Sequence, residues 1–277
     1  MRLGHVGGAR HSGGAMRLVR GERWHEWALA AKNLVFPIFC QACRRRLLTD
    51  DNGYFCATCW ELMPRIERPF CTVCGRPHRA AVGLGTRSNF PCGRCIAAGP
   101  ERPVRRMYGV ARYDGVMERA IKLFKFHGKR RLARPLAELM AAFAEQELEC
   151  DRYDMVVPVP LHPVRERERG FNQARLLAGE VAAVFPRAAV ASVLRRIRPT
   201  RTQSTLRDPR ERRRNIEGAF AVDAAAPPPR GHVLLIDDVV TTGCTVGENA
   251  AVLLNAGAAS VDVLAPALAV LRGEPRR

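Results

Sequence analysis

Eight of the ten cysteines in this chain lie in four Cys-x-x-Cys pairs between residues 40 and 95. The pairs are Cys40/Cys43, Cys56/Cys59, Cys71/Cys74 and Cys92/Cys95. Each pair can form a tight turn that points two thiolates the same way, and two such turns close a tetrahedral shell around one zinc ion. Because a shell of four thiolates leaves no position for a substrate, the spacing predicts two structural zinc sites.

The segments between these cysteines contain few aliphatic runs and several turn-forming glycines, so this region could not bury a core without metal. Pairing of neighbouring pairs, which gives one zinc ribbon after another, is favoured over an interleaved arrangement. Free buried thiols or a redox dithiol are the alternative interpretation. Cys150 and Cys244 are isolated in the sequence, and we expect no metal at either.

The chain is strongly basic, with 45 lysines and arginines against 27 acidic residues and a formal net charge of +18 in 277 residues. Hydrophobic residues make up 47% of the chain, which is enough for a core, and no run of 18 apolar residues predicts a transmembrane segment. Paired cysteines without an export signal indicate a cytoplasmic protein. Met16 is an alternative start, and residues 1–23 are expected to be a disordered tail.

The sequence predicts a double zinc ribbon over residues 24–100 and a larger domain over 101–277, where apolar segments of strand length alternate with segments of helical periodicity. The expected strands cover 104–113, 155–159, 189–194, 219–222, 232–236 and 261–264. The expected helices cover 24–39, 116–126, 132–146, 171–184 and 245–255. Strands that alternate with helices favour an α/β fold, in which helices cover both faces of a parallel sheet.

One stretch, residues 233–245, reads Val-Leu-Leu-Ile-Asp-Asp-Val-Val-Thr-Thr-Gly-Cys-Thr. An apolar strand leads into two acids, a turn of small residues and a helix. The backbone N–H groups of such a turn can bind a phosphate at the carboxyl edge of a parallel sheet. Asp237 and Asp238 would then hold a sugar diol, or Mg²⁺ bound to it. The candidate phosphate ligands are Thr241, Thr242, Gly243, Cys244 and Thr245. In the alternative interpretation the acids only end a strand and Thr245 only caps a helix.

Basic residues cluster in three other segments. His162, Arg165, Arg167 and Arg169 follow a predicted strand, and Asn172 and Gln173, at the start of the next helix, are candidate orienting groups. Residues 195–214 contain nine arginines and are expected to form a mobile loop, which could close over a substrate, contact nucleic-acid phosphates or stay solvated. Lys122, Lys125, His127 and Lys129 alternate with Phe124 and Phe126. One buried and one exposed phenylalanine is the favoured interpretation here, and base stacking is the alternative.

In this order the motifs resemble the ComF family of competence-associated proteins over about residues 34–270. The segments that carry the resemblance are the cysteine pairs, Leu123-Phe-Lys-Phe-His-Gly128, Val157-Pro-Val-Pro-Leu-His-Pro163, Arg167-Glu-Arg-Gly-Phe-Asn-Gln-Ala174, Glu211-Arg-Arg-Arg-Asn-Ile-Glu-Gly-Ala-Phe220 and residues 233–245. The last resembles the phosphoribosyl-pyrophosphate loop of type I phosphoribosyltransferases, although Cys244 stands where that pattern usually has another small residue.

The resemblance implies a type I phosphoribosyltransferase-like sheet preceded by a double zinc ribbon. It also implies that the chain binds phosphoribosyl pyrophosphate and Mg²⁺, with Asp237 and Asp238 as catalytic residues. His162, Arg165, Arg167 and Arg169 would face the departing diphosphate. Two functions are expected from this: phosphoribosyl transfer to a nitrogen nucleophile, or a non-enzymatic scaffold that binds single-stranded DNA during DNA uptake. A DNA-uptake helicase is a possible partner, and the acceptor is not identifiable from the sequence.

Overall fold

The computed structural model describes residues 37–47, 53–78, 89–200 and 208–270. The chain divides into two compact units, residues 1–56 and 57–277. The predicted tail and the predicted helix over 24–39 lie mostly outside the described residues, and the predicted domain boundaries remain predictions. In the first unit, Phe39 and Arg46 form an antiparallel bridge, and the Cys40 N–H donates to the Arg45 carbonyl oxygen at 2.8 Å.

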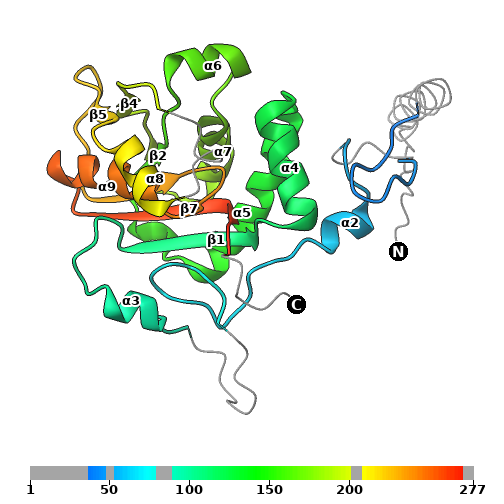
Figure 1. Cartoon of the computed structure of the whole chain (residues 1–277), viewed down its shortest axis with the longest axis horizontal. Helices are drawn as coiled ribbons and strands as arrows, with labels where there is room; N and C mark the ends of the chain where they lie inside the picture. The colour runs from blue at the N-terminus through cyan, green and yellow to red at the C-terminus, as the bar shows by residue number, and fades with distance from the viewer. Residues whose placement is uncertain (1–36, 48–52, 79–88, 201–207, 271–277) are drawn as a thin grey trace, which may run out of the picture. The chain divides into compact units, whose positions relative to one another are not determined.

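A five-stranded parallel sheet forms the centre of the second unit, with the strands in the order β1-β7-β6-β2-β3. The strands are β1 (Arg106–Arg112), β2 (Met155–Pro158), β3 (Ala189–Val190), β6 (His232–Ile236) and β7 (Ser260–Leu268). All four residues of β2 are buried, as are eight of the nine in β7, so both faces of the central strands are covered. The predicted α/β fold is therefore confirmed. Figure 1 shows β1 and β7 side by side.

In the described part of the chain, four long helices flank the sheet strands in the sequence, and two of them begin at a capping side chain. They are α4 (Gly115–Phe126), α5 (Ala133–Glu147), α7 (Gln173–Val181) and α9 (Cys244–Asn255). The Asp114 side chain accepts from the Gly115 N–H, and the Asn172 side chain accepts from two N–H groups in the first turn of α7. Gly243 precedes α9 with a left-handed φ of +83°, which favours glycine. No helix among the described residues is long and apolar enough to cross a membrane.

Shorter elements complete the described structure. They are α2 (Ala57–Glu61), α3 (Gly93–Ala97), η1 (Arg130–Leu132), η2 (Cys150–Arg152), α6 (Pro163–Arg169), η3 (Ala182–Val184), β4 (Leu194–Arg196), α8 (Pro209–Ile216) and β5 (Phe220–Val222). The prediction of one mobile loop over 195–214 was wrong in part, because its last third forms α8 and its start forms β4, which pairs with β5. Residues 201–207 of that segment lie outside the described residues. The predicted strand over 261–264 was too short, because β7 runs on to Leu268.

The second cysteine segment packs along the outer edge of β1. The Met107 N–H donates to the Val73 carbonyl oxygen at 2.8 Å, and the Ile66 N–H donates to the Val110 carbonyl oxygen at 2.9 Å. These bonds satisfy backbone groups on an edge strand that would otherwise stay open. Gly75 has a φ of +67°, and a Cβ added there would lie 2.5 Å from the Met107 oxygen, so only glycine allows this approach.

Replacing Gly75 with alanine should lower the free energy of unfolding by about 2 kcal/mol or more. The left-handed backbone costs a residue with a Cβ about 1–2 kcal/mol, and the contact with Met107 adds to that cost. The matched control is Gly179→Ala in α7, where an added Cβ meets nothing within 4 Å. It should be neutral or stabilise by up to about 1 kcal/mol. Equal effects in urea denaturation of the zinc-loaded variants would contradict the close approach.

Candidate functional site

The eight paired cysteines gather into two sets of four, Cys40, Cys43, Cys56, Cys59 and Cys71, Cys74, Cys92, Cys95. Within each set the sulfurs lie within 4.8 Å of one another. The Cys43 and Cys56 sulfurs are 3.7 Å apart, and those of Cys74 and Cys92 are 3.8 Å apart. Four sulfurs at about 2.3 Å from a tetrahedral zinc ion would be separated by about 3.8 Å. The arrangement therefore fits two structural zinc ions and the sequential pairing.

Backbone N–H groups surround one sulfur in each set. Burial acts to raise the pKa of Cys40, but N–H groups that include those of Ala42 and Cys56 outweigh it and lower this pKa to about 6. The Cys74 thiol, aided by backbone N–H groups, lowers the pKa of Cys71 to about 4. Since zinc binds the thiolate form, these donors favour the metal-binding form of Cys40 and Cys71.

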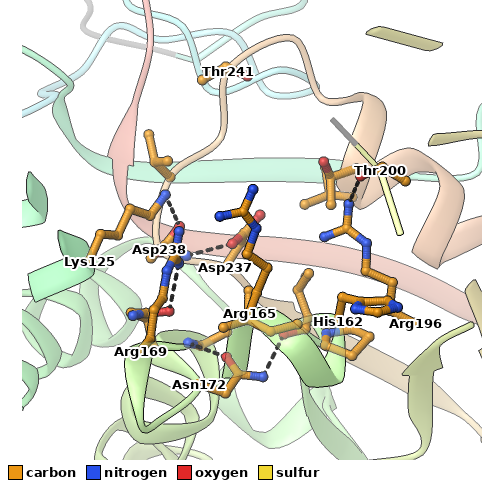
Figure 2. Close-up of a pocket in the computed structure, with 18 of the residues that line it drawn as sticks. Lys125, His162, Arg165, Arg169, Asn172, Arg196, Thr200, Asp237, Asp238 and Thr241 are labelled. Atoms are coloured by element: carbon orange, nitrogen blue, oxygen red, sulfur yellow. Dashed lines mark hydrogen bonds and ion pairs between the residues drawn. The ribbon is translucent and has the colours of Figure 1, made fainter. Parts of the chain in front are cut away.

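A cavity of about 660 Å³ lies at the carboxyl ends of the central strands of the second unit. Strands β2 and β6 are parallel neighbours, with Pro158 opposite Ile236, so the loops that follow them leave the same edge of the sheet. The loop after β2 contributes basic residues and the loop after β6 contributes acids. Figure 2 shows side chains from both loops pointing toward one another.

Asp237 and Asp238 both line this cavity. The Asp238 N–H donates to the Asp237 carboxylate at 2.8 Å, and the Lys125 Nζ lies 2.7 Å from an Asp238 carboxylate oxygen. Asp238 is only 6% exposed, and the Lys125 ammonium offsets part of the cost of burying its carboxylate. Burial, together with the neighbouring charge of Asp238, raises the pKa of Asp237 to about 8, against the opposing effect of Lys125.

The turn between β6 and α9 lies beside these acids. Thr241, Gly243 and Thr245 line the cavity, whereas Thr242 and Cys244 do not appear in its wall. The Thr242 hydroxyl instead donates to the Cys244 sulfur at 3.2 Å. The first N–H groups of a helix have no acceptor within it, and the helix dipole favours an anion there. The start of α9 can therefore bind a phosphate group.

Among the four predicted cations of the loop after β2, His162, Arg165 and Arg169 line the cavity. Arg167 is exposed and lies outside its wall. The His162 ring accepts from the Val164 N–H at 3.3 Å and so caps α6. Burial lowers the pKa of Arg169, and the charge of Asp238 opposes that effect. Arg165 and Arg169 place positive charge opposite the two acids.

Sequence reasoning overlooked several residues of the wall. Lys125 was recognised only as part of a basic strip, and nothing in the sequence connects it to Asp238. Arg196 lines the cavity from β4, where burial lowers the pKa of its guanidinium. Gln173, an expected orienting group at the start of a helix, also lines the cavity, and its Oε1 accepts from Arg169 at 3.1 Å. Asn172, a predicted orienting residue, donates from Nδ2 to the Val159 carbonyl oxygen at 3.0 Å and so positions the loop.

Comparison with known proteins shows clear relatives. A family model described as a double zinc ribbon domain matches residues 31–96. The DNA utilization protein YhgH of Escherichia coli strain K12 is 34% identical over 233 residues, which cover 83% of this chain and 96% of that protein. Competence protein F of Haemophilus influenzae is 28% identical over 232 residues, which cover 82% of this chain and 96% of that protein. A solved structure of the allosteric regulatory enzyme of purine biosynthesis matches 48% of this chain and 26% of its own, with 17% identity and a TM-score of 0.32.

Purified protein should contain two zinc ions per chain. Changing Cys40 to serine should remove one ion and changing Cys92 to serine the other, because each set closes its own shell. The matched control is Cys150→Ser, which should retain both ions. Metal analysis by mass spectrometry measures the stoichiometry, and loss of both ions from one single change would contradict the two separate shells.

The contribution of Asp237 to the stability of the unliganded protein should decline as the pH rises from about 4 to about 8. Across that range the unfolded chain releases the Asp237 proton near its ordinary pKa of 3.8, while the folded chain holds it until about pH 8. Asp237→Asn should flatten this decline, and the exposed control Asp151→Asn should not. Chemical denaturation at a series of pH values measures the effect, and equal slopes in wild type and Asp237→Asn would contradict the raised pKa.

Proposed function

The chain belongs to the ComF family, and from this premise we propose that its cavity binds phosphoribosyl pyrophosphate together with Mg²⁺. We propose further that the protein takes part in DNA uptake or utilisation. The proposal rests on one observation: two acids, a helix N-terminus and a basic loop all line the same cavity. Each group matches a part of the ligand: a diol, a 5′-phosphate and a diphosphate. A cytoplasmic location belongs to the same proposal.

In the proposed complex, Asp237 and Asp238 accept hydrogen bonds from the ribose hydroxyl groups. The N–H groups of residues 241–245 donate to the 5′-phosphate, and Thr241 and Thr245 line the cavity where that phosphate would lie. Arg165 and Arg169 face the diphosphate. Mg²⁺ suits this site because carboxylate and phosphate oxygens are its preferred ligands, and when bound it would neutralise charge on the diphosphate. Lys125 must then exchange its ion pair with Asp238 for a contact to the ligand or to solvent.

This arrangement also supports transfer of the phosphoribosyl group. The C1–O bond to diphosphate would break, a C1–N bond to a nitrogen nucleophile would form, and that nitrogen would lose its proton. Positive charge from Arg165 and Arg169 would stabilise the leaving diphosphate, while the acids hold the sugar in position. The residues of this chain therefore contribute positioning and electrostatic stabilisation.

A second candidate function is a scaffold that binds single-stranded DNA without turnover. The names of the relatives, a DNA utilization protein and a competence protein, favour it. So does α8, whose Arg213 and Arg214 are exposed. Ionic contacts of this kind bind the DNA backbone with little sequence preference. A DNA-uptake helicase remains a partner suggested by the family alone.

Asp238→Asn should weaken the binding of phosphoribosyl pyrophosphate by about one to two decades. The change removes a charge-assisted hydrogen bond worth roughly 1.5–3 kcal/mol. Asp151→Asn is the matched control, because Asp151 is exposed and lies outside the cavity wall. Isothermal titration with Mg²⁺ present measures both, and pyrophosphate release with candidate bases tests turnover. An unchanged affinity in Asp238→Asn, or no binding to wild type at millimolar ligand, would contradict the proposal.

The double change Arg213→Ala and Arg214→Ala should weaken binding of single-stranded DNA and reduce the slope of log affinity against log salt by about 1.4. This value assumes one phosphate contact per arginine at about 0.7 each. A charge-matched control is the double change of Arg134 and Arg187 to alanine, two exposed arginines outside the cavity wall. If both double variants behave alike, α8 is not the DNA contact.

A further inference from the structure

The last residue of α4, Phe126, exposes 61% of its surface and lines the cavity. Phe124, two residues earlier, is fully buried and packs against Phe171 with the ring centroids 5.6 Å apart. The core therefore uses one ring of this pair and leaves the other at the cavity. Because most of its surface is exposed, the Phe126 ring is available to a ligand.

A guanidinium group lies against this ring. The Arg169 Cζ is 5.3 Å from the Phe126 ring centroid, and its Nη1 donates to the Gln173 Oε1 at 3.1 Å. Because Gln173 holds Arg169, the cation and the ring form a positioned pair. Arginine and aromatic planes together are the usual stacking partners of nucleobases.

The same group of residues contains a buried donor without an acceptor. Gln173 is 1% exposed and lines the cavity, and its Nε2 has no hydrogen-bond partner among the described residues. A buried amide N–H without a partner is rare in folded proteins. Oε1 of the same amide accepts a hydrogen bond from Arg169, so Nε2 is the atom of this amide left for a ligand. A small adjustment of the side chain could direct Nε2 to an acceptor on that ligand. Carbonyl oxygens and unprotonated ring nitrogens of a nucleobase are acceptors of that kind.

The surroundings of Phe126 favour a planar polar ring over an aliphatic chain. Lys125 comes directly before Phe126 and pairs with Asp238, while Arg165 and Arg169 also line the cavity. Val164, 44% exposed, is a second large apolar side chain in the wall. A nucleobase combines an apolar face with polar edges and is carried by phosphate-bearing molecules, so its chemistry matches this mixture.

We propose that Phe126 and Arg169 form a stacking site for a nucleobase, with Gln173 as a hydrogen-bond donor to its edge. The inference deepens the proposed function, because it rests on the same cavity and adds the class of ligand beside the sugar site. The base can come from two sources, a free base that would serve as phosphoribosyl acceptor or a base of single-stranded DNA. Both share the aromatic face that Phe126 recognises.

The first test compares a thymidine oligonucleotide with an abasic oligonucleotide of equal length and charge. Phe126→Ala should reduce affinity for the thymidine strand, or for free adenine and thymine, by about tenfold. Affinity for the abasic strand should stay unchanged, and Phe126→Trp should retain base binding. Val190→Ala is the matched control, because Val190 is 44% exposed but lies outside the cavity wall. If Phe126→Ala has no effect on any base-bearing ligand, or changes abasic and base-bearing strands equally, the stacking site is wrong.

Phe126→Trp identifies the source of the base. The fluorescence of the introduced tryptophan is measured as the difference between the variant and the wild type. Binding of a nucleobase against that tryptophan should quench this fluorescence. Quenching by free adenine or thymine supports the acceptor, and quenching only by the thymidine strand supports the DNA base. Quenching by neither would overturn the proposal.

Titration of phosphoribosyl pyrophosphate separates this inference from the proposed function. Asp238→Asn should weaken the binding of that ligand and should keep base stacking. Base stacking by a wild type that does not bind phosphoribosyl pyrophosphate would contradict only the proposed function, and the stacking site would stand.

Discussion

The candidate site depends on the parallel pairing of β2 with β6. Their register places Pro158 opposite Ile236, so the two loops that follow start at one edge of the sheet. Acids from one loop and arginines from the other would otherwise be separated by more than sixty residues of chain. Both strands are buried on both faces, and a slip in register would move charged side chains into the core. The apolar strands thus fix the geometry of a polar cavity.

Charge balance within the cavity is the second constraint. Adjacent carboxylates at Asp237 and Asp238 repel one another, and burial increases that cost. Lys125 compensates by pairing with Asp238, while Asp237 keeps its proton to higher pH than an ordinary aspartic acid. A ligand that offers hydroxyl groups to the acids and phosphate groups to the arginines would replace this internal arrangement.

Local patterns made much of the fold predictable. The expected strand over 232–236 matches β6, and the cysteine spacing predicted both sets of four sulfurs. These features depend on neighbouring residues, so the sequence displays them directly. The pairing of Lys125 with Asp238 and the contact of Arg169 with Phe126 join distant segments, and no local pattern encodes them. Helix α8 was overlooked because its charged sequence lacks an apolar stripe; it contributes Ile216 as its buried residue among those described.

We infer that the acids, the turn before α9 and the loop after β2 bind the three parts of phosphoribosyl pyrophosphate. A crystal structure of the zinc-loaded chain with this ligand and Mg²⁺ tests that claim most directly. We expect the 5′-phosphate at residues 241–245, the ribose hydroxyl groups on Asp237 and Asp238, and Lys125 released from Asp238. Ligand density elsewhere on the chain, or a fully occupied ligand with the Lys125–Asp238 pair intact and no contact to either acid, would contradict it.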